Sequence, residues 1–441
     1  MDFDESLQYL LSLGHETLAI KLGLDNIERL LRAFDCPQNS YPSVQIAGTN
    51  GKGSTAAMLD AICRAAQIKT GLYTSPHLSI ITERIRLDGQ EISRDDFART
   101  ATLVRRMAES LVQAGALEAT PTFFEQITTI ALVAFREANV QLAILETGLG
   151  GRLDATTAAQ AGIVAITPIA LDHQEYLGAT VSDIAAEKAA IIRPSASAII
   201  ASQIPEAREV IFQRCDAVGV TPRYDDCAIE VNGSSEQGRL RVTFSTPHDV
   251  YENVLLNLRG RHQTVNAALS IRLAEALRER GFNISHRAII SGLEKAAHAG
   301  RLEIWKARNS LPKFLFDGAH NAAGAQALCD YLREFINEPL TLIFGAMRDK
   351  DLSAIARALF PLAHKIILTQ LDNPRAATIE NLANLASQLK VEPSQIIRTS
   401  SSLVAAINAA ISITPSCGMI CVTGSLYLVG AAQDILRQKN Y

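Results

Sequence analysis

The sequence lacks an excess of positive charge, a long hydrophobic run and a patterned set of cysteines. Its formal net charge is -4 over 441 residues, so no basic surface favours nucleic acid or anionic lipid as a partner. The apolar runs are broken by Thr, Gln, Pro or Gly before they reach the length of a membrane span. The acidic start, Met1–Glu5, is unlike the basic segment of a secretory signal. We therefore expect a cytoplasmic protein that binds neither nucleic acid nor membrane.

The cysteines form neither a disulfide framework nor a zinc site. An odd number of thiols without a spacing pattern is typical of reduced cysteines in a cytosol. Cys417 and Cys421 are four positions apart, but no His or Cys pair nearby completes a zinc site. We interpret both as buried, small apolar residues. The seven cysteines are Cys36, Cys63, Cys215, Cys227, Cys329, Cys417 and Cys421.

Apolar strands alternate with helices over the first 200 or so residues. This alternation predicts an α/β fold with a mostly parallel sheet covered by helices on both faces. We expect the strands at 44–47, 69–73, 141–145, 163–167 and 198–201. We expect helices at 5–35, where Ile20, Leu24, Ile27, Leu30, Leu31 and Phe34 have helical spacing, and at 55–62, 94–116, 122–138 and 184–192.

A second alternating set begins near residue 300. Before it, residues 222–260 predict a small antiparallel excursion, and 264–281 and 286–297 predict helices. The later strands, which indicate a smaller Rossmann-like α/β domain, are expected at 314–316, 340–344, 365–368 and 419–422. We divide the chain into domains 1–298 and 299–441, with no low-complexity linker or internal repeat between them.

A glycine-rich turn joins the first strand to the next helix and predicts a phosphate-binding loop. Its glycines can adopt backbone angles that direct successive N–H groups at one anion, and the helix N-terminus adds positive charge. Lys52 can reach the terminal phosphates, and the hydroxyl of Ser54 or Thr55 can meet a magnesium ion. The spacing departs from the usual Walker pattern, and the alternative is a turn without a ligand. The loop is Gly48, Thr49, Asn50, Gly51, Lys52, Gly53, Ser54 and Thr55.

Three polar residues, Ser75, Glu146 and His173, follow other strands of the same expected sheet. In open α/β sheets ligands bind at the carboxyl ends of strands, so these side chains and the phosphate loop are expected to converge. Glu146 at the end of an apolar strand needs a partner, either a magnesium ion or Arg152 across the glycine turn. His173 can also be a structural histidine, and its ring favours manganese or zinc as much as magnesium.

Lys188 lies in a strongly apolar predicted helix, where a buried amine is costly unless it is paired or modified. The alternative is a surface lysine that pairs with Asp183 or Glu187. Asn266, Arg301 and Asp317 are isolated polar residues in apolar surroundings, and their spacing alone assigns them no role.

Assembled in order, these segments resemble the folylpolyglutamate synthase/dihydrofolate synthase family of the Mur ligase superfamily. The resemblance covers the whole chain, and the opening Ile20–Leu24 is also similar. The motifs that carry it are Gly48–Ser54 with Thr55, Thr74–Leu78, Glu83–Arg86, Gly148–Ala155, Leu171–His173, Glu187–Ala189, His262-Gln263 with Asn266, Gly300–Glu303, Asp317–Asn321, Asn373–Arg375 and Gly424–Tyr427.

The resemblance implies an ATP-dependent amide ligase of folate biosynthesis and one-carbon metabolism. A pterin-bearing substrate's carboxylate would attack the γ-phosphate of ATP, and the amine of L-glutamate would then attack the acyl phosphate. Dihydropteroate and reduced folates would be the acceptors, Mg²⁺ would occupy two sites, and the enzyme would be a monomer. Lys52 and the metal ions would neutralise charge on the transferred phosphoryl group. A dry cleft between the two domains would protect the acyl phosphate from water.

The family also implies roles for individual residues. Gly51–Ser54 would hold ATP phosphates, Ser75, Glu146 and His173 would hold magnesium, and a carbamylated Lys188 would bind a second magnesium. Asn266, Arg301 and Asp317 would contact the nucleotide. The pterin would lie along Thr122, Phe123, Phe124, Glu125, Leu153, Asp154 and Ala155, and His320 and Ser425 would face the glutamate.

The sequence departs from the family pattern at Thr147, at Thr157, and at His298-Ala299, and none of these changes removes an expected ligand. The competing hypotheses are a cell-wall Mur ligase, a monofunctional folylpolyglutamate synthase, a small-molecule kinase and a non-enzymatic nucleotide switch. A cell-wall ligase carries roughly a hundred more residues before its phosphate loop, which here starts at Gly48. A kinase needs no second domain to bring an amino acid, and a switch leaves Glu146, His173 and Lys188 unexplained.

Overall fold

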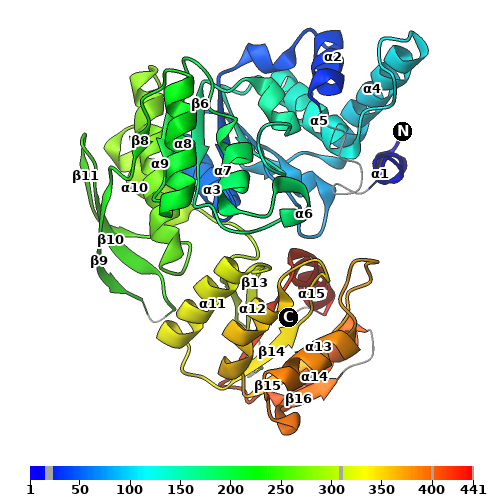
Figure 1. Cartoon of the computed structure of the whole chain (residues 1–441), viewed down its shortest axis with the longest axis vertical. Coiled ribbons are helices and arrows are strands. Elements are labelled where there is room, and N and C mark those ends of the chain that lie inside the picture. Colours follow the sequence, from blue (N-terminus) through cyan, green and yellow to red (C-terminus); the bar gives the residue numbers. More distant parts are fainter. Residues whose placement is uncertain (15–22, 236, 307–310, 399–401, 440–441) are drawn as a thin grey trace. The chain divides into compact units, whose positions relative to one another are not determined.

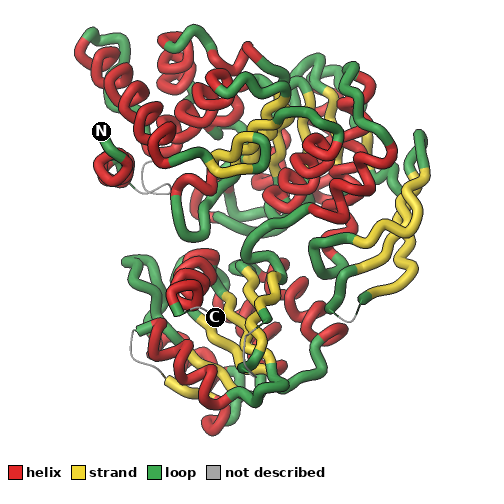
Figure 2. Tube along the Cα trace, turned by 180° about the vertical axis from the view of Figure 1, so that it is seen from behind, coloured by secondary structure: helices red, strands yellow, loops and turns green. Residues whose placement is uncertain are grey.

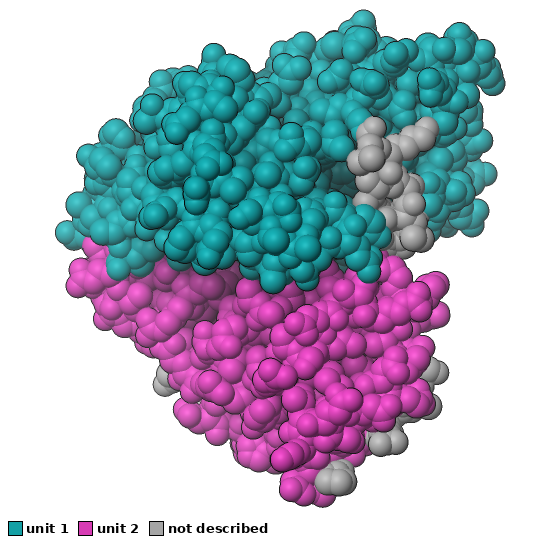
Figure 3. All heavy atoms as spheres, viewed as in Figure 1, with its two compact units in different colours: residues 1–229, 244–252, 265–296 teal, residues 230–243, 253–264, 297–441 magenta. Residues whose placement is uncertain are grey.

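The computed structural model describes residues 1–14, 23–235, 237–306, 311–398 and 402–439. The chain forms two compact units, coloured separately in Figure 3. The first unit comprises Met1–Ile229, Phe244–Glu252 and Val265–Ala296. The second comprises Glu230–Thr243, Asn253–Thr264 and Ala297–Tyr441. None of the helices in the described ranges is both long and apolar enough to span a membrane.

The first unit is built on a mostly parallel sheet. Its strands are β1 (Ser43–Ala47), β2 (Thr70–Tyr73), β3 (Ile85–Leu87), β4 (Gln90–Glu91), β5 (Leu142–Glu146), β6 (Ile163–Ile166), β7 (Ser197–Ile200) and β8 (Arg223–Tyr224). Their order across the sheet is β4-β3-β2-β5-β1-β6-β7-β8, and only the β2–β3 and β3–β4 pairs among these are antiparallel. β1 therefore lies between β5 and β6, and the carboxyl ends of all three meet at one edge of the sheet.

The second unit has its own sheet. Its strands are β12 (Glu303–Trp305), β13 (Lys313–Asp317), β14 (Leu340–Phe344), β15 (Lys365–Leu368), β16 (Ile396–Arg398) and β17 (Met419–Thr423). The order is β12-β13-β17-β14-β15-β16, parallel except for the β12–β13 pair. Both sheets agree with the predicted α/β fold class, and the parallel strands are buried along nearly their whole length.

Three further strands form a separate small sheet in the region where an antiparallel excursion was predicted. They are β9 (Ala228–Ser234), β10 (Leu240–Ser245) and β11 (Val250–Leu255), in the order β11-β10-β9. The short connections between consecutive strands fit hairpins. The boundaries between the two units run through all three strands and through the next helix, α9 (His262–Glu279).

Helices border the strands in each unit (Figures 1 and 2). In the first unit they are α1 (Phe3–Ser12), α2 (Asp25–Ala33), α3 (Lys52–Ala65), α4 (Arg94–Gln113), α5 (Phe123–Glu137), α6 (Gln174–Leu177), α7 (Val181–Ala189), α8 (Pro205–Ala217) and α10 (His286–Lys295). In the second unit they are α11 (Ala322–Phe335), α12 (Leu352–Leu359), α13 (Ile379–Gln388), α14 (Leu403–Ile413) and α15 (Leu426–Gln438). Single 3-10 turns occur at η1 (Pro37–Ser40), η2 (Ile81–Arg84), η3 (Ala155–Ala159), η4 (Phe360–Leu362) and η5 (Pro393–Gln395).

The apolar cores explain this arrangement. α5 packs its buried face on β2 and β5, and α7 and α8 pack on β6 and β7, so two core clusters cover the first sheet. α3 contacts β1, β2 and β5 and packs closely on α10, where the Cα of Gly292 faces the backbone of Ile62. In the second unit, α11, α12 and α13 form one packed row, and α14 packs against α15.

Two sequence predictions of local structure were wrong. The single helix expected at 5–35 is interrupted between α1 and α2, where Gly14 and Gly23 have φ values of 98° and 144° that a continuing helix cannot contain. Ile20, part of that prediction, lies outside the described residues. Cys417 is exposed, although Cys421 is buried as expected. All seven cysteines are free thiols.

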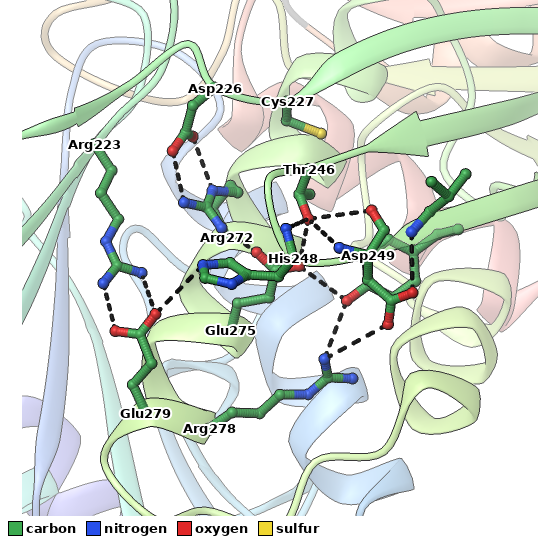
Figure 4. Close-up of polar contacts among 12 residues, drawn as sticks. Arg223, Asp226, Cys227, Thr246, His248, Asp249, Arg272, Glu275, Arg278 and Glu279 are labelled. Carbon is green, nitrogen blue, oxygen red and sulfur yellow. Dashed lines mark hydrogen bonds and ion pairs between the residues drawn. The ribbon is translucent and has the colours of Figure 1, made fainter.

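A buried network of charged side chains ties α9 to the segments around it within the first unit (Figure 4). Arg272 makes a two-pronged contact with Asp226, with Nε–Oδ1 at 2.8 Å and Nη2–Oδ2 at 2.6 Å, and also pairs with Glu275. Glu275 accepts further hydrogen bonds from Thr246 Oγ1 at 2.7 Å and Tyr251 Oη at 3.0 Å. The side chains of Arg272 and Glu275 are only 4% and 2% exposed, so each charge depends on its partners.

Removing the cation from this network should be strongly destabilising. Arg272→Met leaves two carboxylates without their shared partner, which we expect to cost about 3 kcal/mol of unfolding free energy. Guanidinium unfolding followed by circular dichroism measures the loss. The matched control is Arg32→Met, whose exposed pair with Glu28 should contribute about 0.5 kcal/mol or less. Equal stability of the two variants would contradict this account of the network.

Candidate active site

The predicted phosphate loop lies at the carboxyl end of β1, and two of its glycines are required by close neighbours. Gly51, the N-cap of α3, has φ 92°, and a Cβ added there would lie 2.2 Å from Asn266 Oδ1. Gly48 has φ 142°, and its added Cβ would lie 1.9 Å from Thr167 Oγ1. At both positions a residue with a Cβ would adopt an unfavourable left-handed backbone and would also clash with a neighbouring side chain. The loop can therefore reach this shape only with glycine at both positions.

Hydrogen bonds to the segment after β6 fix the first half of the loop. The backbone N–H groups of Thr49 and Asn50 donate to the carbonyl of Pro168 at 3.2 and 3.4 Å. The Thr49 hydroxyl exchanges hydrogen bonds with the backbone of Ala170. Lys52 Nζ donates to the carbonyls of Gly48 and Thr49 at 3.2 and 3.1 Å. The lysine ammonium thus lies over the loop, where an anion held by the loop would meet it.

The second half of the loop is the first turn of α3. N–H groups in the first turn of a helix have no intrahelical acceptor and point outward with the positive end of the helix dipole. Lys52, Gly53 and Ser54 occupy this turn, and Ser54 and Thr55 are buried. Ser270 of α9 donates to the Thr55 carbonyl at 3.1 Å, which couples α9, the helix that carries Asn266, to α3. This end of the sheet can therefore bind a polyphosphate.

Ser75 and Glu146 meet beside the loop, as the sequence predicted. The backbone N–H of Ser75 donates to Glu146 Oε2 at 3.2 Å. Glu146 is buried at the end of β5. The Ser75 hydroxyl is buried and has no hydrogen-bond partner among the described residues. A buried hydroxyl oxygen beside a buried carboxylate is a pair of hard oxygen ligands, which is what Mg²⁺ prefers.

Lys188 is buried close to the loop. Burial, and after it the nearby charge of Lys52, lower its pKa to about 7, and Asp172 and Asp154 oppose this shift. These contributions show which charged groups surround the amine. His173, which follows Asp172, has a left-handed backbone with φ 51°, and its Nε2 lies 3.9 Å from Asp172 Oδ1. Because the pKa of Lys188 is about 7, its buried amine is partly neutral near pH 7.

The simpler pairings that the sequence left open are not formed. Arg152 pairs with Glu187, with Nε–Oε1 at 2.9 Å, rather than with Glu146. Asp183 caps α7 by accepting hydrogen bonds from Thr180. Glu187 and Asp183, the two candidate partners of Lys188, are therefore both engaged elsewhere.

The expected metal ligands form two neighbouring groups rather than one finished site. Ser75 and Glu146 are in contact, and His173 and Lys188 share Asp172 as a neighbour. Among the described residues, no group of three His, Cys, Asp or Glu side chains is close enough to hold a metal ion. The unpartnered hydroxyl of Ser75 nevertheless fits a metal bound together with a nucleotide, whose phosphate oxygens would complete the coordination.

The segments expected to hold the pterin lie together next to this edge. The ring of Phe124 covers Gly148, where an added Cβ would be 2.4 Å from the ring, and packs against Tyr73 with centroids 6.1 Å apart. Asp154 accepts hydrogen bonds from the N–H groups of Gly148 and Leu149 at 2.8 and 3.0 Å, and from Thr156. Asp154 therefore organises this loop, and burial raises the pKa of its carboxyl.

The remaining members of this set have local roles that the structure describes. Thr122 and Glu125 form a reciprocal cap at the start of α5, with Thr122 N to Glu125 Oε2 at 2.7 Å. Phe123 and Ala155 are buried, whereas Leu153 is 38% exposed. Leu153 is thus an apolar side chain that is available to a ligand.

The second unit gathers its own predicted residues at the carboxyl ends of β13 and β17. These strands are paired with Asp317 opposite Thr423, so His320 and Ser425 follow neighbouring strands. Asp317 is buried and accepts hydrogen bonds from the N–H groups of Leu302 and Ala319, both at 3.0 Å. Arg301 approaches the same turn, since a Cβ on Gly318 would lie 2.6 Å from its Nη1. Ser425 caps α15 through Tyr427 N.

Sequence reasoning missed several polar residues of the first unit. Asp172 was part of a motif without a role, although its position in the segment that follows β6 was a usable signal. Gln45, in the middle of an apolar strand, donates to Thr156 and Thr157 at 2.9 and 2.8 Å. Thr157, a departure from the family pattern, also donates to the Gly151 carbonyl at 2.7 Å. A polar residue within a buried strand is the signal that would have revealed this cluster.

Comparisons with known proteins identify the family that this chain resembles along its length. The Mur ligase middle domain matches residues 46–274, and the Mur ligase, glutamate ligase domain matches residues 300–426. The dihydrofolate synthase/folylpolyglutamate synthase of Mycobacterium tuberculosis is 34% identical over 97% of this chain and 93% of its own length.

Solved structures are similar over nearly their whole length. M. tuberculosis folylpolyglutamate synthase complexed with ADP has a TM-score of 0.90 at 33% identity, covering 98% of this chain and 99% of that chain. E. coli FolC in complex with DHPP and ADP has a TM-score of 0.86 at 29% identity, covering 100% and 99%. A bifunctional Yersinia pestis enzyme complexed with AMPPNP and Mn ion has a TM-score of 0.84 at 27% identity, covering 99% and 98%.

Lys188 should make the stability of the metal-free chain depend on pH. Its pKa is about 7 in the folded chain and 10.5 ordinarily. Below the folded value the amine is charged in both states, so the folded state bears the full desolvation cost. As pH rises from the folded towards the unfolded value, the folded chain loses the proton first and stability increases.

Lys188→Met should therefore be more stable than the wild type at low pH, and this advantage should shrink as pH rises. Urea unfolding in CO₂-depleted buffer with EDTA, at about pH 6.5 and about pH 9, measures the difference. Lys295→Met, at an exposed position of α10, should show no such trend. A Lys188→Met difference that is the same at both pH values would mean that the amine does not titrate in this range.

Proposed function

This chain belongs to the Mur ligase family, in its dihydrofolate synthase/folylpolyglutamate synthase group, and we propose that it adds L-glutamate to dihydropteroate and to reduced folates. It is an ATP-dependent acid–amino-acid ligase. The observation that carries the proposal is the phosphate loop, whose shape depends on Gly48 and Gly51 and whose lysine lies over the anion position. Relatives crystallised with ADP or AMPPNP support ATP as the nucleotide.

The proposed reaction has two steps. A carboxylate oxygen of the acceptor attacks the γ-phosphorus of ATP, the bond to the β–γ bridging oxygen breaks, and ADP leaves. The amine nitrogen of glutamate then attacks the carbonyl carbon of the acyl phosphate, and inorganic phosphate and a proton leave. Each step transfers a group between negatively charged partners, so catalysis depends on positioning and charge neutralisation.

In this proposal the phosphate loop and Asn266 hold the nucleotide. N–H groups of the first turn of α3 bind phosphate oxygens. Lys52 exchanges its two carbonyl acceptors for the β- and γ-phosphates and offsets the charge that develops during transfer. Asn266, packed against Gly51, fixes the loop from the side of α9.

Ser75, Glu146 and His173 are proposed to hold one divalent cation. The buried, unpartnered Ser75 hydroxyl beside Glu146 supports this set, and the Mn ion of the Yersinia pestis structure supports a divalent metal in this group of enzymes. When bound, such a cation withdraws electron density from phosphate oxygens and lowers the barrier to attack. Glu146 also holds the backbone of Ser75, because its Oε2 accepts a hydrogen bond from the Ser75 N–H.

Lys188 is proposed to become carbamylated and to help bind a second magnesium ion. Its burial, and the engagement of Asp183 and Glu187 with other groups, support a modified lysine rather than one paired with either of these two carboxylates. A carbamate forms when the neutral amine nitrogen attacks carbon dioxide and releases a proton. The product is anionic and carboxylate-like, which suits a position beside Lys52.

The acceptor is proposed to lie against Phe124, Leu153 and the loop that Asp154 organises. Phe124 presents a ring over Gly148, and exposed Leu153 offers apolar contact to a pterin or aminobenzoyl group. The E. coli structure with DHPP and ADP supports a pterin acceptor for enzymes of this group. We call the surface formed by Phe124 and Leu153 the acceptor wall. The residues that would support it are Thr122, Phe123, Glu125 and Ala155.

The second unit is proposed to supply the glutamate side of the reaction. We assign residues 1–298 to ATP and acceptor binding and 299–441 to glutamate, with Arg301 and Asp317 directed to the nucleotide. His320 and Ser425 follow the neighbouring strands β13 and β17, which supports a shared ligand for the two. The match of residues 300–426 to a glutamate ligase domain supports the same assignment.

We further propose that the enzyme acts in the cytoplasm as a monomer. The seven free thiols are consistent with a reducing compartment. The second candidate function is a monofunctional folylpolyglutamate synthase, because relatives of this chain include proteins with that single name.

Glutamate-dependent ADP release tests the function. Purified protein with MgATP and L-glutamate should release ADP with dihydropteroate and, separately, with tetrahydrofolate. Lys52→Ala should lower both rates by about 1,000-fold or more, because it removes charge stabilisation of the transferred phosphoryl group. Release with tetrahydrofolate alone would establish the monofunctional enzyme. Release that ignores glutamate would indicate a kinase or a switch and overturn the proposal.

Lys188→Ala should lose most activity and regain part of it with added formate or acetate. The small carboxylate would enter the space vacated by the side chain and replace the carbamate. Carbon-13 NMR of the wild type in labelled bicarbonate should show a carbamate signal that Lys188→Ala lacks. A fully active Lys188→Ala enzyme, or a signal that persists in the variant, would exclude the carbamate.

A further inference from the structure

The segment that carries Ser75 is held by two neighbouring residues to which the proposed reaction gives no role. Residues 74–84 connect β2 to β3, and these strands pair with Tyr73 opposite Ile85. Where the two ends of this connection meet, the N–H of Thr74 donates to the Arg84 carbonyl at 3.0 Å. Glu83 and Arg84, at the end of η2, therefore stand directly across the loop from Ser75.

Glu83 binds three consecutive backbone N–H groups of this loop. Its Oε2 accepts from Leu78 N at 2.7 Å, and its Oε1 accepts from Ser79 N at 2.9 Å and Ile80 N at 2.8 Å. Hydrogen bonds from N–H groups to a carboxylate are short and strong. One side chain thus fixes the backbone of the three residues that follow Pro76 and His77.

Arg84 fixes the other part of the loop. The arginine is 1% exposed, and its Nε donates to His77 Nδ1 at 2.7 Å. Its guanidinium carbon lies 5.5 Å from the centroid of the Phe123 ring. Phe123 is the first residue of α5, next to Phe124 on the proposed acceptor wall. Arg84 therefore joins the Ser75 loop to the helix that forms this wall.

The remaining support of Ser75 comes from Glu146, which accepts its N–H. Ser75 is thus held on one side by a proposed metal ligand and on the other by the loop that Glu83 and Arg84 constrain. A single hydroxyl binds a metal well only if its oxygen is positioned beforehand, because the ordering cost is otherwise subtracted from the binding energy.

We propose that Glu83 and Arg84 are positioning residues that preset the Ser75 hydroxyl for the metal–nucleotide complex and couple it to the acceptor wall through His77 and Phe123. The inference rests on the proposed function, because it takes Ser75 as a metal ligand. Neither residue touches the reacting atoms. Their effect reaches the site through the backbone of residues 75–80, in which Glu83 binds the N–H groups of Leu78, Ser79 and Ile80.

Manganese binding tests the proposal independently of turnover. Electron paramagnetic resonance measures the dissociation constant of Mn²⁺ for the full chain with a non-hydrolysable ATP analogue. Ser75→Ala sets the scale for loss of the ligand itself. Glu83→Ala should weaken Mn²⁺ binding about tenfold, in the range expected for groups that orient a ligand. Glu83→Gln should weaken it less, because its one oxygen can still accept from Ser79 and Ile80.

The matched control is Glu91→Ala. Glu91 is exposed, lies on β4 of the same antiparallel extension and accepts a hydrogen bond from the Thr82 hydroxyl at 2.9 Å rather than from the loop backbone. This variant should bind Mn²⁺ as the wild type does. Amide hydrogen exchange of residues 75–80 should be faster in Glu83→Ala and unchanged in Glu91→Ala, which connects the loss of affinity to the loop itself.

The outcomes separate the inference from the function on which it rests. If Ser75→Ala weakens Mn²⁺ binding and both Glu83 variants bind as the wild type does, the positioning role is wrong and the metal site stands. If Ser75→Ala binds Mn²⁺ normally, the proposed metal ligand and the positioning role both fall. Should Glu83→Ala fold poorly in thermal unfolding, Glu83→Gln and Arg84→Lys decide, since each keeps the volume and loses part of the contacts.

Discussion

The close approach of Asn266 and Thr167 to the phosphate loop is the constraint on which the site depends. A Cβ added at Gly51 would lie only 2.2 Å from Asn266, and one added at Gly48 only 1.9 Å from Thr167. Only glycine therefore leaves room for these two side chains. The loop is thereby held between α9 and the end of β6, and the start of α3 takes a fixed direction. Lys52, Ser54 and Thr55 are then presented together, so the packing of the two neighbouring side chains determines the shape of the loop that we propose to bind phosphate.

Carboxylates that accept several backbone hydrogen bonds organise irregular segments in each of the two units. Glu83 and Asp154 each accept two or more backbone N–H groups of a segment that follows a strand. Asp317 accepts one N–H group before β12 and one after β13. Because a carboxylate has about four acceptor positions, one side chain can replace several hydrogen bonds of regular structure. The protein thus uses charged residues as structural centres of its irregular segments, and residues that we propose to face ligands, such as Ser75, are carried on loops held in this way.

The sequence predicted the parallel strands, their polar ends and the meeting of Ser75 with Glu146, because alternation of apolar segments and the carboxyl-end rule are local signals. It failed where geometry depends on distant residues. The break between α1 and α2 reflects two left-handed glycines rather than apolar spacing. The partners of Arg152 and Glu187, the surroundings of Lys188 and the cluster around Gln45 join segments far apart in the chain, which one sequence cannot pair.

The way the chain is threaded through β9, β10, β11 and α9 has a consequence for how this protein can have evolved. The polypeptide passes from one unit to the other at five points between residues 229 and 297. Gln237 and Arg261 lie inside this interval but belong to the second unit. Within that unit they form hydrogen bonds with Tyr331 and Glu334. If the chain were cut at any single position, at least one unit would be divided between the two fragments. A single crossover between two genes therefore cannot exchange one whole unit for another.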